Sequence, residues 1–152
     1  MNKREKSIKN RRAQFEFFLL QTFNAGIVLT GTEIKSVREG KVNLKDAFCQ
    51  IHEGELWVKN MHISHYKFAS YNNHITTRER KLLLKKREIK KIASKLKEKG
   101  LTVVPVQMYI SERGYAKLDI SLAKGKKFFD KRDTIKQKDN KRELDRVMKD
   151  YR

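Results

Sequence analysis

The residues with the clearest chemical potential lie in one short segment, LAKGKKFFDKRD, at positions 122–133. Five Lys and Arg residues there surround two consecutive rings, Phe128 and Phe129. Lys and Arg neutralise phosphates and aromatic rings stack on unpaired bases, so the combination is typical of an RNA-binding surface. The alternative for the two rings is a packing role at the edge of the folded domain. The segment therefore predicts contact with RNA.

No enzymatic or metal-binding motif accompanies this segment. The sequence lacks a phosphate-binding glycine-rich loop, a Cys-x-x-Cys pair and a His-Glu-x-x-His motif. His62 and His65 are three residues apart, a spacing that metal sites use, but no further Cys or His pattern joins them. Cys49 falls on the expected inner face of a strand, where a thiol is inert. We therefore expect no catalytic residues, no metal, no cofactor and no enzymatic activity.

The positive charge is concentrated in three segments. The 152 residues carry a formal net charge of +19, with 37 Lys and Arg against 18 Asp and Glu. Residues 1–14 contribute +5, residues 78–99 contribute +8 and residues 124–152 contribute +6, while the rest of the chain is neutral. Solvated surfaces usually mix both signs. Three basic segments on a neutral body therefore favour a polyanionic partner, either nucleic acid or an anionic membrane surface.

Composition also limits the compartment. The single cysteine excludes an internal disulfide and fits a reducing cytosol. No apolar run of about 18 residues or more is present, so no membrane-spanning helix is expected. The charged start of the chain lacks the apolar segment of a secretory signal. We expect a cytoplasmic protein with one domain and an extension.

The apolar patterns predict a protein built mainly from short strands. Residues 115–123 alternate between apolar and polar side chains, as in a strand with one buried face. Residues 78–99 carry an apolar stripe at helical spacing, and Gly100 ends that helix. The remaining elements are strands predicted at 15–29, 46–52, 55–63 and 102–110, a short helix at 33–39, and a loop at 64–77.

This order of elements predicts a mainly β fold, a small antiparallel OB-like (Greek-key) barrel of about six strands with flanking helices. The alternative is an open α+β sheet. We expect a basic N-terminal arm at 1–14, the RNA-binding barrel with helix 78–99 at 15–123, and a basic C-terminal tail at 124–152. The tail has few apolar residues, so we expect it to be disordered when free and to become helical on a partner.

Four motifs occur in the order and spacing of a known family. They are NRRA (10–13), NAGIVLTGTEIKSVREGKVNL (24–44), RERKLLL (78–84) and LAKGKKFFDKRDTIK (122–136). On these motifs the chain resembles the SsrA-binding protein family, small protein B, from about residue 10 to the end. The second and fourth motifs together are specific to that family.

The resemblance implies an RNA-binding adaptor of trans-translation. Such a protein binds the tRNA-like domain of transfer-messenger RNA (tmRNA), and reaches elongation factor Tu indirectly through the aminoacylated RNA. It delivers the RNA to the small-subunit decoding centre (16S rRNA) of a stalled ribosome, where its tail senses the empty mRNA channel. The resemblance implies no membrane partner, and we expect a monomer. The alternatives are a general ribosomal or structured-RNA-binding protein with the same barrel, or an RNA-processing enzyme.

The family motifs also imply which residues bind RNA. The expected RNA-binding residues are Asn10, Arg11, Arg12, Glu33, Lys35, Arg38, Lys41, Asn43, Lys124, Lys126 and Lys127. The residues expected at the decoding centre and mRNA channel are Phe129, Asp130, Lys131, Arg132, Lys136 and Lys138.

Two of these residues carry further qualifications from the sequence. Glu33 also lies in the first turn of a predicted helix, where a carboxylate can simply cap the helix. Phe129 stands where related proteins often have His or Tyr. Its ring can still stack, but it cannot form the hydrogen bond that a His or Tyr would offer.

Overall fold

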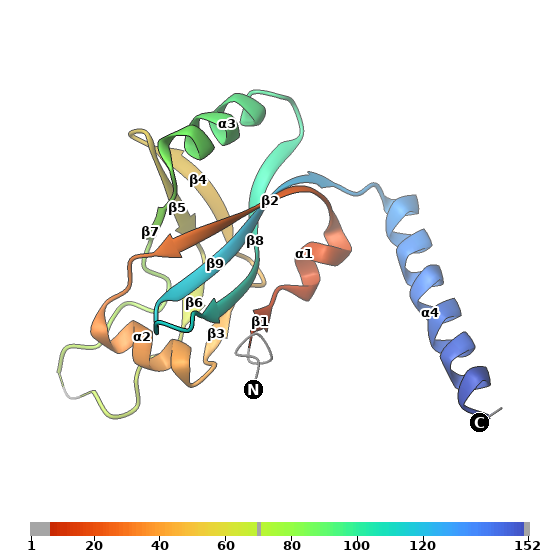
Figure 1. Cartoon of the computed structure of the whole chain (residues 1–152), viewed down its shortest axis with the longest axis horizontal. Coiled ribbons are helices and arrows are strands. Elements are labelled where there is room, and N and C mark those ends of the chain that lie inside the picture. The colour runs from red at the N-terminus through yellow and green to blue at the C-terminus, as the bar shows by residue number, and fades with distance from the viewer. Residues whose placement is uncertain (1–6, 70, 151–152) are drawn as a thin grey trace.

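A closed antiparallel barrel forms the body of the protein (Figure 1). The computed structural model describes residues 7–69 and 71–150, without the side chains of Phe128, Phe129 and Asp150. Nine strands are described within these ranges: β1 (Ile8–Lys9), β2 (Phe17–Ile27), β3 (Val42–Asn43), β4 (Phe48–His52), β5 (Glu55–Lys59), β6 (His62–Ile63), β7 (Arg80–Leu83), β8 (Leu101–Ile110) and β9 (Ala116–Gly125). The described helices are α1 (Arg11–Glu16), α2 (Gly31–Arg38), α3 (Lys86–Leu96) and α4 (Phe128–Asp150).

The barrel closes because β8 and β9 pair with each other as well as with other strands. The sheet runs in the order β1-β8-β4-β5-β7-β2-β9, and the additional β8–β9 pairing joins its ends into a ring of six strands. Every strand pair in the described part of the chain is antiparallel, and Val103 lies opposite both Cys49 and Leu122. The predicted barrel of about six strands is therefore confirmed, and the open sheet is excluded.

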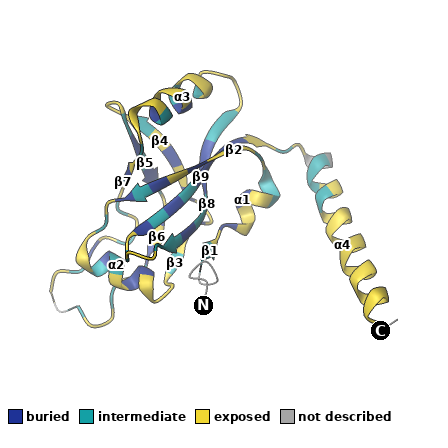
Figure 2. Ribbon diagram, viewed as in Figure 1, coloured by how far each residue is buried: buried dark blue, intermediate teal, exposed yellow. Residues whose placement is uncertain are grey.

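Alternation along the strands builds the core of the barrel. Leu118, Ile120 and Leu122 of β9 point inward and are buried, as the sequence pattern predicts. They pack with Val103 and Met108 of the paired strand β8, and Figure 2 shows buried residues along both strands. Burial of side chains of this size contributes roughly 1.5–3 kcal/mol each. The hairpin of β8 and β9 thus contributes one hydrophobic wall of the barrel.

The predicted helix at 78–99 is wrong in its first part. Residues 80–83 form strand β7, which pairs with β5 and β2, and only Lys86–Leu96 is helical. The physical reason is that Arg80 and Leu82 both point into the barrel, a period of two that a helix cannot provide. A buried Arg is not visible to a pattern that assigns charged residues to the surface.

Two other predicted strands have different bounds. Residues 11–16 form α1, so the strand expected at 15–29 begins at Phe17. The strand expected at 55–63 is interrupted at Asn60, whose φ of 58° lies in the left-handed region and turns the chain. After this turn β6 pairs with β3 in a separate two-stranded sheet. Strand β3 follows α2 along the chain, and Leu44 after β3 accepts a hydrogen bond from Asn10 at the start of α1.

The C-terminal segment, for which the sequence predicts a loose tail, is a single helix of 23 residues, α4. It extends away from the barrel, and its side chains are mostly exposed beyond the first two turns (Figure 2). Contacts with the body are made near its start, against α1. Among the residues described, no helix combines the length and apolar character needed to cross a membrane.

Candidate nucleic-acid interface

A shallow groove brings two of the sequence motifs together. It lies between the start of α1 and β3 and has a volume of about 260 Å³. Arg11 and Arg12 of the first motif line one side, and Asn43 of the second motif and the adjacent Lys45 line the other. The side chains of all four residues are largely exposed to solvent. The groove therefore offers cations and an amide to a phosphate backbone.

Asn10 holds this groove together but does not lie open to it. Its Nδ2 donates to the carbonyl oxygens of Leu44 at 3.0 Å and Pro105 at 2.8 Å. Its Oδ1 accepts from the N–H of Ala13 at 3.2 Å, so the same side chain caps α1. Asn10 is buried and positions the start of α1, and its expected contact with RNA stays a prediction.

Arg12 is oriented by two carboxylates. Its Nε lies 2.9 Å from Glu16 Oε1 and its Nη1 lies 2.9 Å from Asp46 Oδ1. The hydrogen bond and charge of Glu16, with a smaller contribution from Asp46, raise the pKa of Arg12. The two ion pairs orient the guanidinium beside the groove, a geometry that favours an oriented phosphate contact.

The exposed side of α2 extends the basic surface beyond the groove. Lys35, Arg38 and Lys41 are exposed, and Lys41 leads directly into β3. Lys35 Nζ lies 5.3 Å from the ring centroid of Tyr66, within the range of a cation–π interaction. Lys41 Nζ lies 3.3 Å from Glu39 Oε2 at the surface, a pair that water weakens. These three cations are available to a polyanion.

Glu33, on the inner side of α2, caps its helix, which is the alternative that the sequence left open. Its side chain is 0% exposed, so it has no surface with which to contact RNA in this conformation. Glu33 Oε1 accepts from Arg78 Nη2 at 2.6 Å and from the N–H of Thr30 at 2.9 Å, and Oε2 accepts from Arg80 Nε. The carboxylate caps α2 and pairs with two arginines in the protein without RNA, and its expected contact with RNA stays a prediction.

The ionisation of Glu33 follows from these partners. Burial opposes the charged form, but hydrogen bonds from Arg78, the Thr30 N–H and Arg80 outweigh it and lower the pKa of Glu33 to about 2. Arg80 is also fully buried, and it donates Nη1 to the Met61 carbonyl oxygen at 2.7 Å. The buried pair thus joins α2 to β7 and to the residue before β6.

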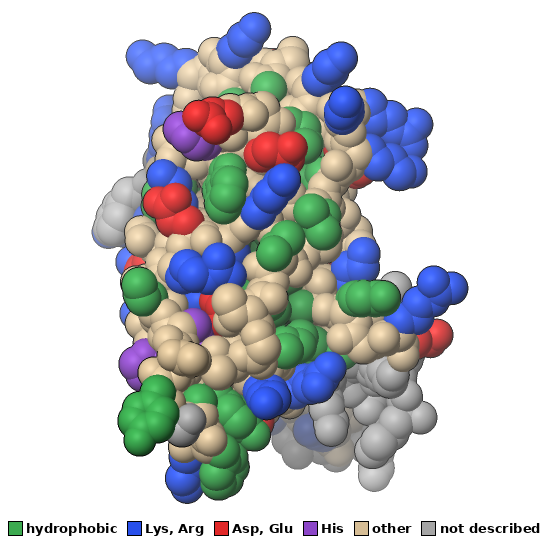
Figure 3. Space-filling view, turned by 90° about the vertical axis from the view of Figure 1, so that its left-hand side faces the viewer, with side chains coloured by type: hydrophobic (Ala, Val, Ile, Leu, Met, Phe, Trp, Pro, Cys, Tyr) green, Lys and Arg blue, Asp and Glu red, His purple; other side chains and the backbone are tan. Residues whose placement is uncertain are grey.

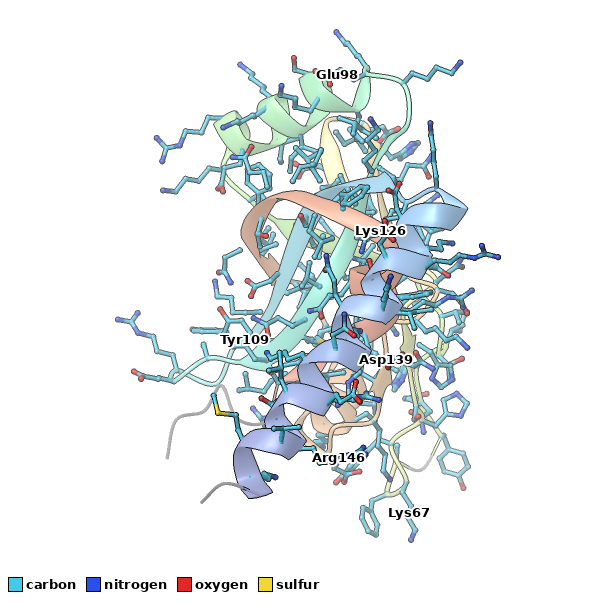
Figure 4. All side chains as sticks on the ribbon, turned by 90° about the vertical axis from the view of Figure 1, so that its right-hand side faces the viewer. Lys67, Glu98, Tyr109, Lys126, Asp139 and Arg146 are labelled. Atoms are coloured by element: carbon cyan, nitrogen blue, oxygen red, sulfur yellow. The ribbon has the colours of Figure 1, made fainter. Side chains whose placement is uncertain are left out.

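After the groove and the exposed side of α2, a third group of basic side chains lies where β9 passes into α4. Lys124 is exposed, and Lys126 Nζ lies 5.2 Å from the ring centroid of Phe18 and 2.9 Å from Thr134 Oγ1. The N–H of Lys126 donates to the carbonyl oxygen of Glu16 at 2.8 Å. Figure 4 shows Lys126 at the start of α4. These contacts fix the direction in which the helix leaves the body.

The first turn of α4 is capped by Asp130. The N–H of Lys127, which is exposed, donates to Asp130 Oδ2 at 3.3 Å. A carboxylate in a first helical turn is also stabilised by the helix dipole. Lys131 is half-buried, and the exposed residues that follow on the helix include Arg132, Lys136 and Lys138.

The ring of Phe129 lies outside the described side chains, so its expected stacking on a base stays a prediction. The roles expected of the other α4 residues at the ribosome also stay predictions.

The sequence reasoning missed the residues that support this surface. Arg78 and Arg80 were assigned to a solvated helix, and His74 was not assigned any role. His74 is buried, with Nδ1 at 2.9 Å from Thr32 Oγ1 and Nε2 at 2.9 Å from the carbonyl oxygen of Ile63. The one available signal was the run of three leucines at 82–84, because a short apolar run next to charged residues also fits a strand.

The single cysteine and the possible metal ligands were the other candidates for reactive chemistry. Cys49 is buried in the core, and burial raises the pKa of its thiol, so the predicted inert role fits. Within residues 7–69 and 71–150, no three His, Cys, Asp or Glu side chains lie close enough together to hold a metal ion.

A closed OB-like barrel with cations gathered along α1, α2 and the β9–α4 junction defines the class of nucleic-acid-binding β-barrel proteins. The model of the family described as SmpB protein matches residues 7–150, and the chain therefore belongs to this family. The resemblance found in the sequence motifs is confirmed.

Individual relatives match over nearly the whole chain. The chain is 56% identical over 143 residues to an SsrA-binding protein of Phocaeicola vulgatus, covering 94% of this chain and 95% of the relative. It is 57% identical, with the same coverage, to an SsrA-binding protein of Bacteroides thetaiotaomicron. A chain of the solved structure "tmRNA-SmpB: a journey to the center of the bacterial ribosome" matches with a TM-score of 0.69 and 46% identity, covering 81% of this chain and 86% of that one.

Proposed function

We propose that the protein is an RNA-binding adaptor of trans-translation, which binds the tRNA-like domain of tmRNA and delivers it to stalled ribosomes. The relatives are SsrA-binding proteins, and the matching structure places an SmpB protein with tmRNA on the bacterial ribosome. The observation that carries the proposal for this chain is the basic surface itself. Its cations come from three sequence motifs and meet on one barrel.

The body binds RNA through the groove, the exposed side of α2 and the β9–α4 junction. Arg11, Arg12 and Lys41 neutralise phosphates there, and Asn43 adds an amide donor and acceptor. Asn10 and Glu33 act indirectly, because each holds in place an element that carries exposed cations. This division explains how two buried polar residues belong to motifs of an RNA-binding family.

The helix α4 contacts a second partner. It points away from the RNA-binding body (Figure 1), and exposed Lys and Arg side chains continue along it. Figure 4 shows side chains along this helix. We assign it to the vacant mRNA channel next to the decoding centre, where 16S rRNA supplies phosphates. The first turn, with Phe129, Asp130, Lys131 and Arg132, lies closest to the body and would meet the decoding centre first.

The remaining parts of the proposal follow from this adaptor role. The protein acts as a monomer without catalysis of its own, and elongation factor Tu joins through the aminoacylated RNA. Because the protein acts on ribosomes, it acts in the cytoplasm.

Sequencing the RNA that copurifies with the protein from cells tests the proposal. One dominant species with a tRNA-like end is expected. A broad population of ribosomal RNA would instead favour a general ribosomal or structured-RNA-binding protein. Incubation of the purified protein with labelled RNA tests whether it is an RNA-processing enzyme, because cleavage or modification of that RNA would contradict an adaptor role.

A further inference from the structure

The loop between β6 and β7 is closed at its neck by one side chain. Asn73 Oδ1 accepts from the N–H of Tyr66 at 3.1 Å, and Asn73 Nδ2 donates to the carbonyl oxygen of Tyr66 at 3.0 Å. The N–H of Ala69 donates to the same carbonyl oxygen at 3.1 Å, which makes a turn inside the loop. The loop is therefore a compact surface loop with both ends tied together.

The neck of the loop is also fastened to α2, which carries exposed cations. His74 follows Asn73 directly and bonds to Thr32 of α2 and to the carbonyl oxygen of Ile63, each at 2.9 Å. The buried Glu33 adds a second attachment through Arg78 and Arg80. The base of the loop thus has a fixed position relative to the basic side chains of α2.

The tip of the loop presents aromatic rings to solvent instead of burying them. Phe68 is 74% exposed and Tyr71 is 96% exposed. The rings of Tyr66 and Phe68 meet edge to face, with centroids 5.7 Å apart. We call Phe68 and Tyr71 the aromatic tip, and the half-buried Tyr66 at the neck supports the ring of Phe68. In Figure 3, hydrophobic side chains gather at the lower left of the molecule beside Lys and Arg side chains.

Cations accompany the aromatic tip. Lys35 Nζ of α2 lies 5.3 Å from the ring centroid of Tyr66, and Lys67 Nζ lies 6.0 Å from that of Phe68. Rings with adjacent cations are suited to unpaired nucleotides, since the ring stacks on the base while the cation meets the phosphate. An interface core with a protein partner is instead depleted of Lys.

We propose that the aromatic tip stacks on unpaired bases of the RNA that is bound along α2. This inference rests on the proposed function, because it adds a base-stacking site to the same RNA surface. The chemistry requires a nucleotide that is not in a regular duplex, such as one in a loop of the folded RNA. Stacking does not require a particular base, so the site contributes affinity and orientation more than sequence recognition.

Binding of a fluorescently labelled transcript of the tmRNA tRNA-like domain tests this inference in the full chain. The variants are Tyr71→Phe, which keeps a ring, and Tyr71→Leu, which keeps an apolar side chain of similar exposure but removes the ring. The matched control is Tyr115→Leu, at a residue that is 66% exposed in the β8–β9 turn. Figure 4 places Tyr109, near that turn, and Lys67 on opposite sides of the molecule.

We expect Tyr71→Leu to raise the Kd about fivefold or more, in line with the loss of one stacked base. Tyr71→Phe and Tyr115→Leu should bind as the unsubstituted protein does. Equal urea unfolding midpoints for all variants exclude misfolding as the cause. A 2-aminopurine placed in turn at each unpaired position of the RNA should lose fluorescence on binding at one or more positions, and should regain it with Tyr71→Leu.

Each other outcome overturns the inference in a recognisable way. Unchanged RNA binding by both Tyr71→Leu and Phe68→Leu removes the stacking site but leaves the proposed function intact. Equal losses in Tyr71→Phe and Tyr71→Leu indicate a hydroxyl contact instead of stacking. Normal binding of the transcript by Tyr71→Leu with impaired ribosome association assigns the tip to the ribosome instead of to this RNA. Failure of the unsubstituted protein to bind the transcript contradicts the proposed function itself.

Discussion

Replacement of Glu33 by Gln tests whether the buried ion pair stabilises the whole RNA-binding surface. The substitution keeps the shape of the side chain but removes its charge, leaving the fully buried Arg80 and the partly exposed Arg78 without a counterion. Removal of one partner from a buried pair costs about 3–5 kcal/mol. The shift of the Glu33 pKa from an ordinary 4.5 to about 2 corresponds to about 3 kcal/mol. We therefore expect the free energy of unfolding to fall by about 3 kcal/mol at pH 7.

The pH dependence gives this prediction a definite sign. The folded-state pKa of Glu33 is lower than its unfolded value, so its contribution to stability is fully present above pH 4.5. The contribution is lost as the pH falls from 4.5 toward about 2, where the native carboxylate becomes protonated. The difference in stability between the unsubstituted protein and Glu33→Gln should therefore shrink across this range.

Urea unfolding, followed by circular dichroism at several pH values, measures both quantities. Glu39→Gln is the matched control, because Glu39 lies just after the same helix and pairs with Lys41 at the surface, where a bridge contributes less than about 1 kcal/mol. A loss below about 1 kcal/mol for Glu33→Gln, or a difference that stays constant down to pH 3, would refute the reasoning. A double-mutant cycle with Arg80→Met should show coupling between the two sites.

Three further predictions concern the groove and the C-terminal helix. Asn10→Ala should lower the free energy of unfolding by about 1–3 kcal/mol, because it removes a helix cap and two N–H groups that donate to carbonyl oxygens. The control Asn72→Ala, at an exposed residue, should change the free energy of unfolding little. Equal losses of stability in the two variants would contradict the positioning role of Asn10. Arg11→Ala should reduce the slope of log K against log salt for RNA binding by about 0.7–0.9, and an unchanged slope would show that Arg11 contacts no phosphate. A chain that ends at Lys127 should bind the RNA within about twofold of the full chain but fail in tagging of stalled polypeptides. Equal loss of both activities would show that body and helix do not divide the two partners.

The sequence predicted elements well where a local pattern matched the tertiary environment. The alternation in 115–123 corresponds to β9, because one face of that strand lies against the core and the other against solvent. The family motifs identified the three basic regions. The composition of those motifs alone also indicated an RNA partner.

The sequence failed where a distant residue determines the local structure. Arg80 is buried because Glu33, 47 positions away, neutralises it, and no window of neighbouring residues contains that information. Asn10 likewise bonds to Leu44 and Pro105, so its role as a cap and clamp depends on contacts made only in the fold. The exposed rings of the aromatic tip lie in a segment without helical or strand periodicity. Sequence patterns there predict a loop but give no sign that it binds a ligand.

The start of α4 has a consequence for the distance at which the protein can act. The contacts of Lys126 with Glu16, Phe18 and Thr134 set the point at which the helix leaves the barrel. A helix of 23 residues is about 35 Å long. While this helix stays intact, the body and the far end of α4 are held apart by a spacer of nearly constant length. A contact made by the last turn of α4 therefore lies about 35 Å from one made by its first turn, so the protein can measure how far a partner extends from the body as well as recognise its chemistry.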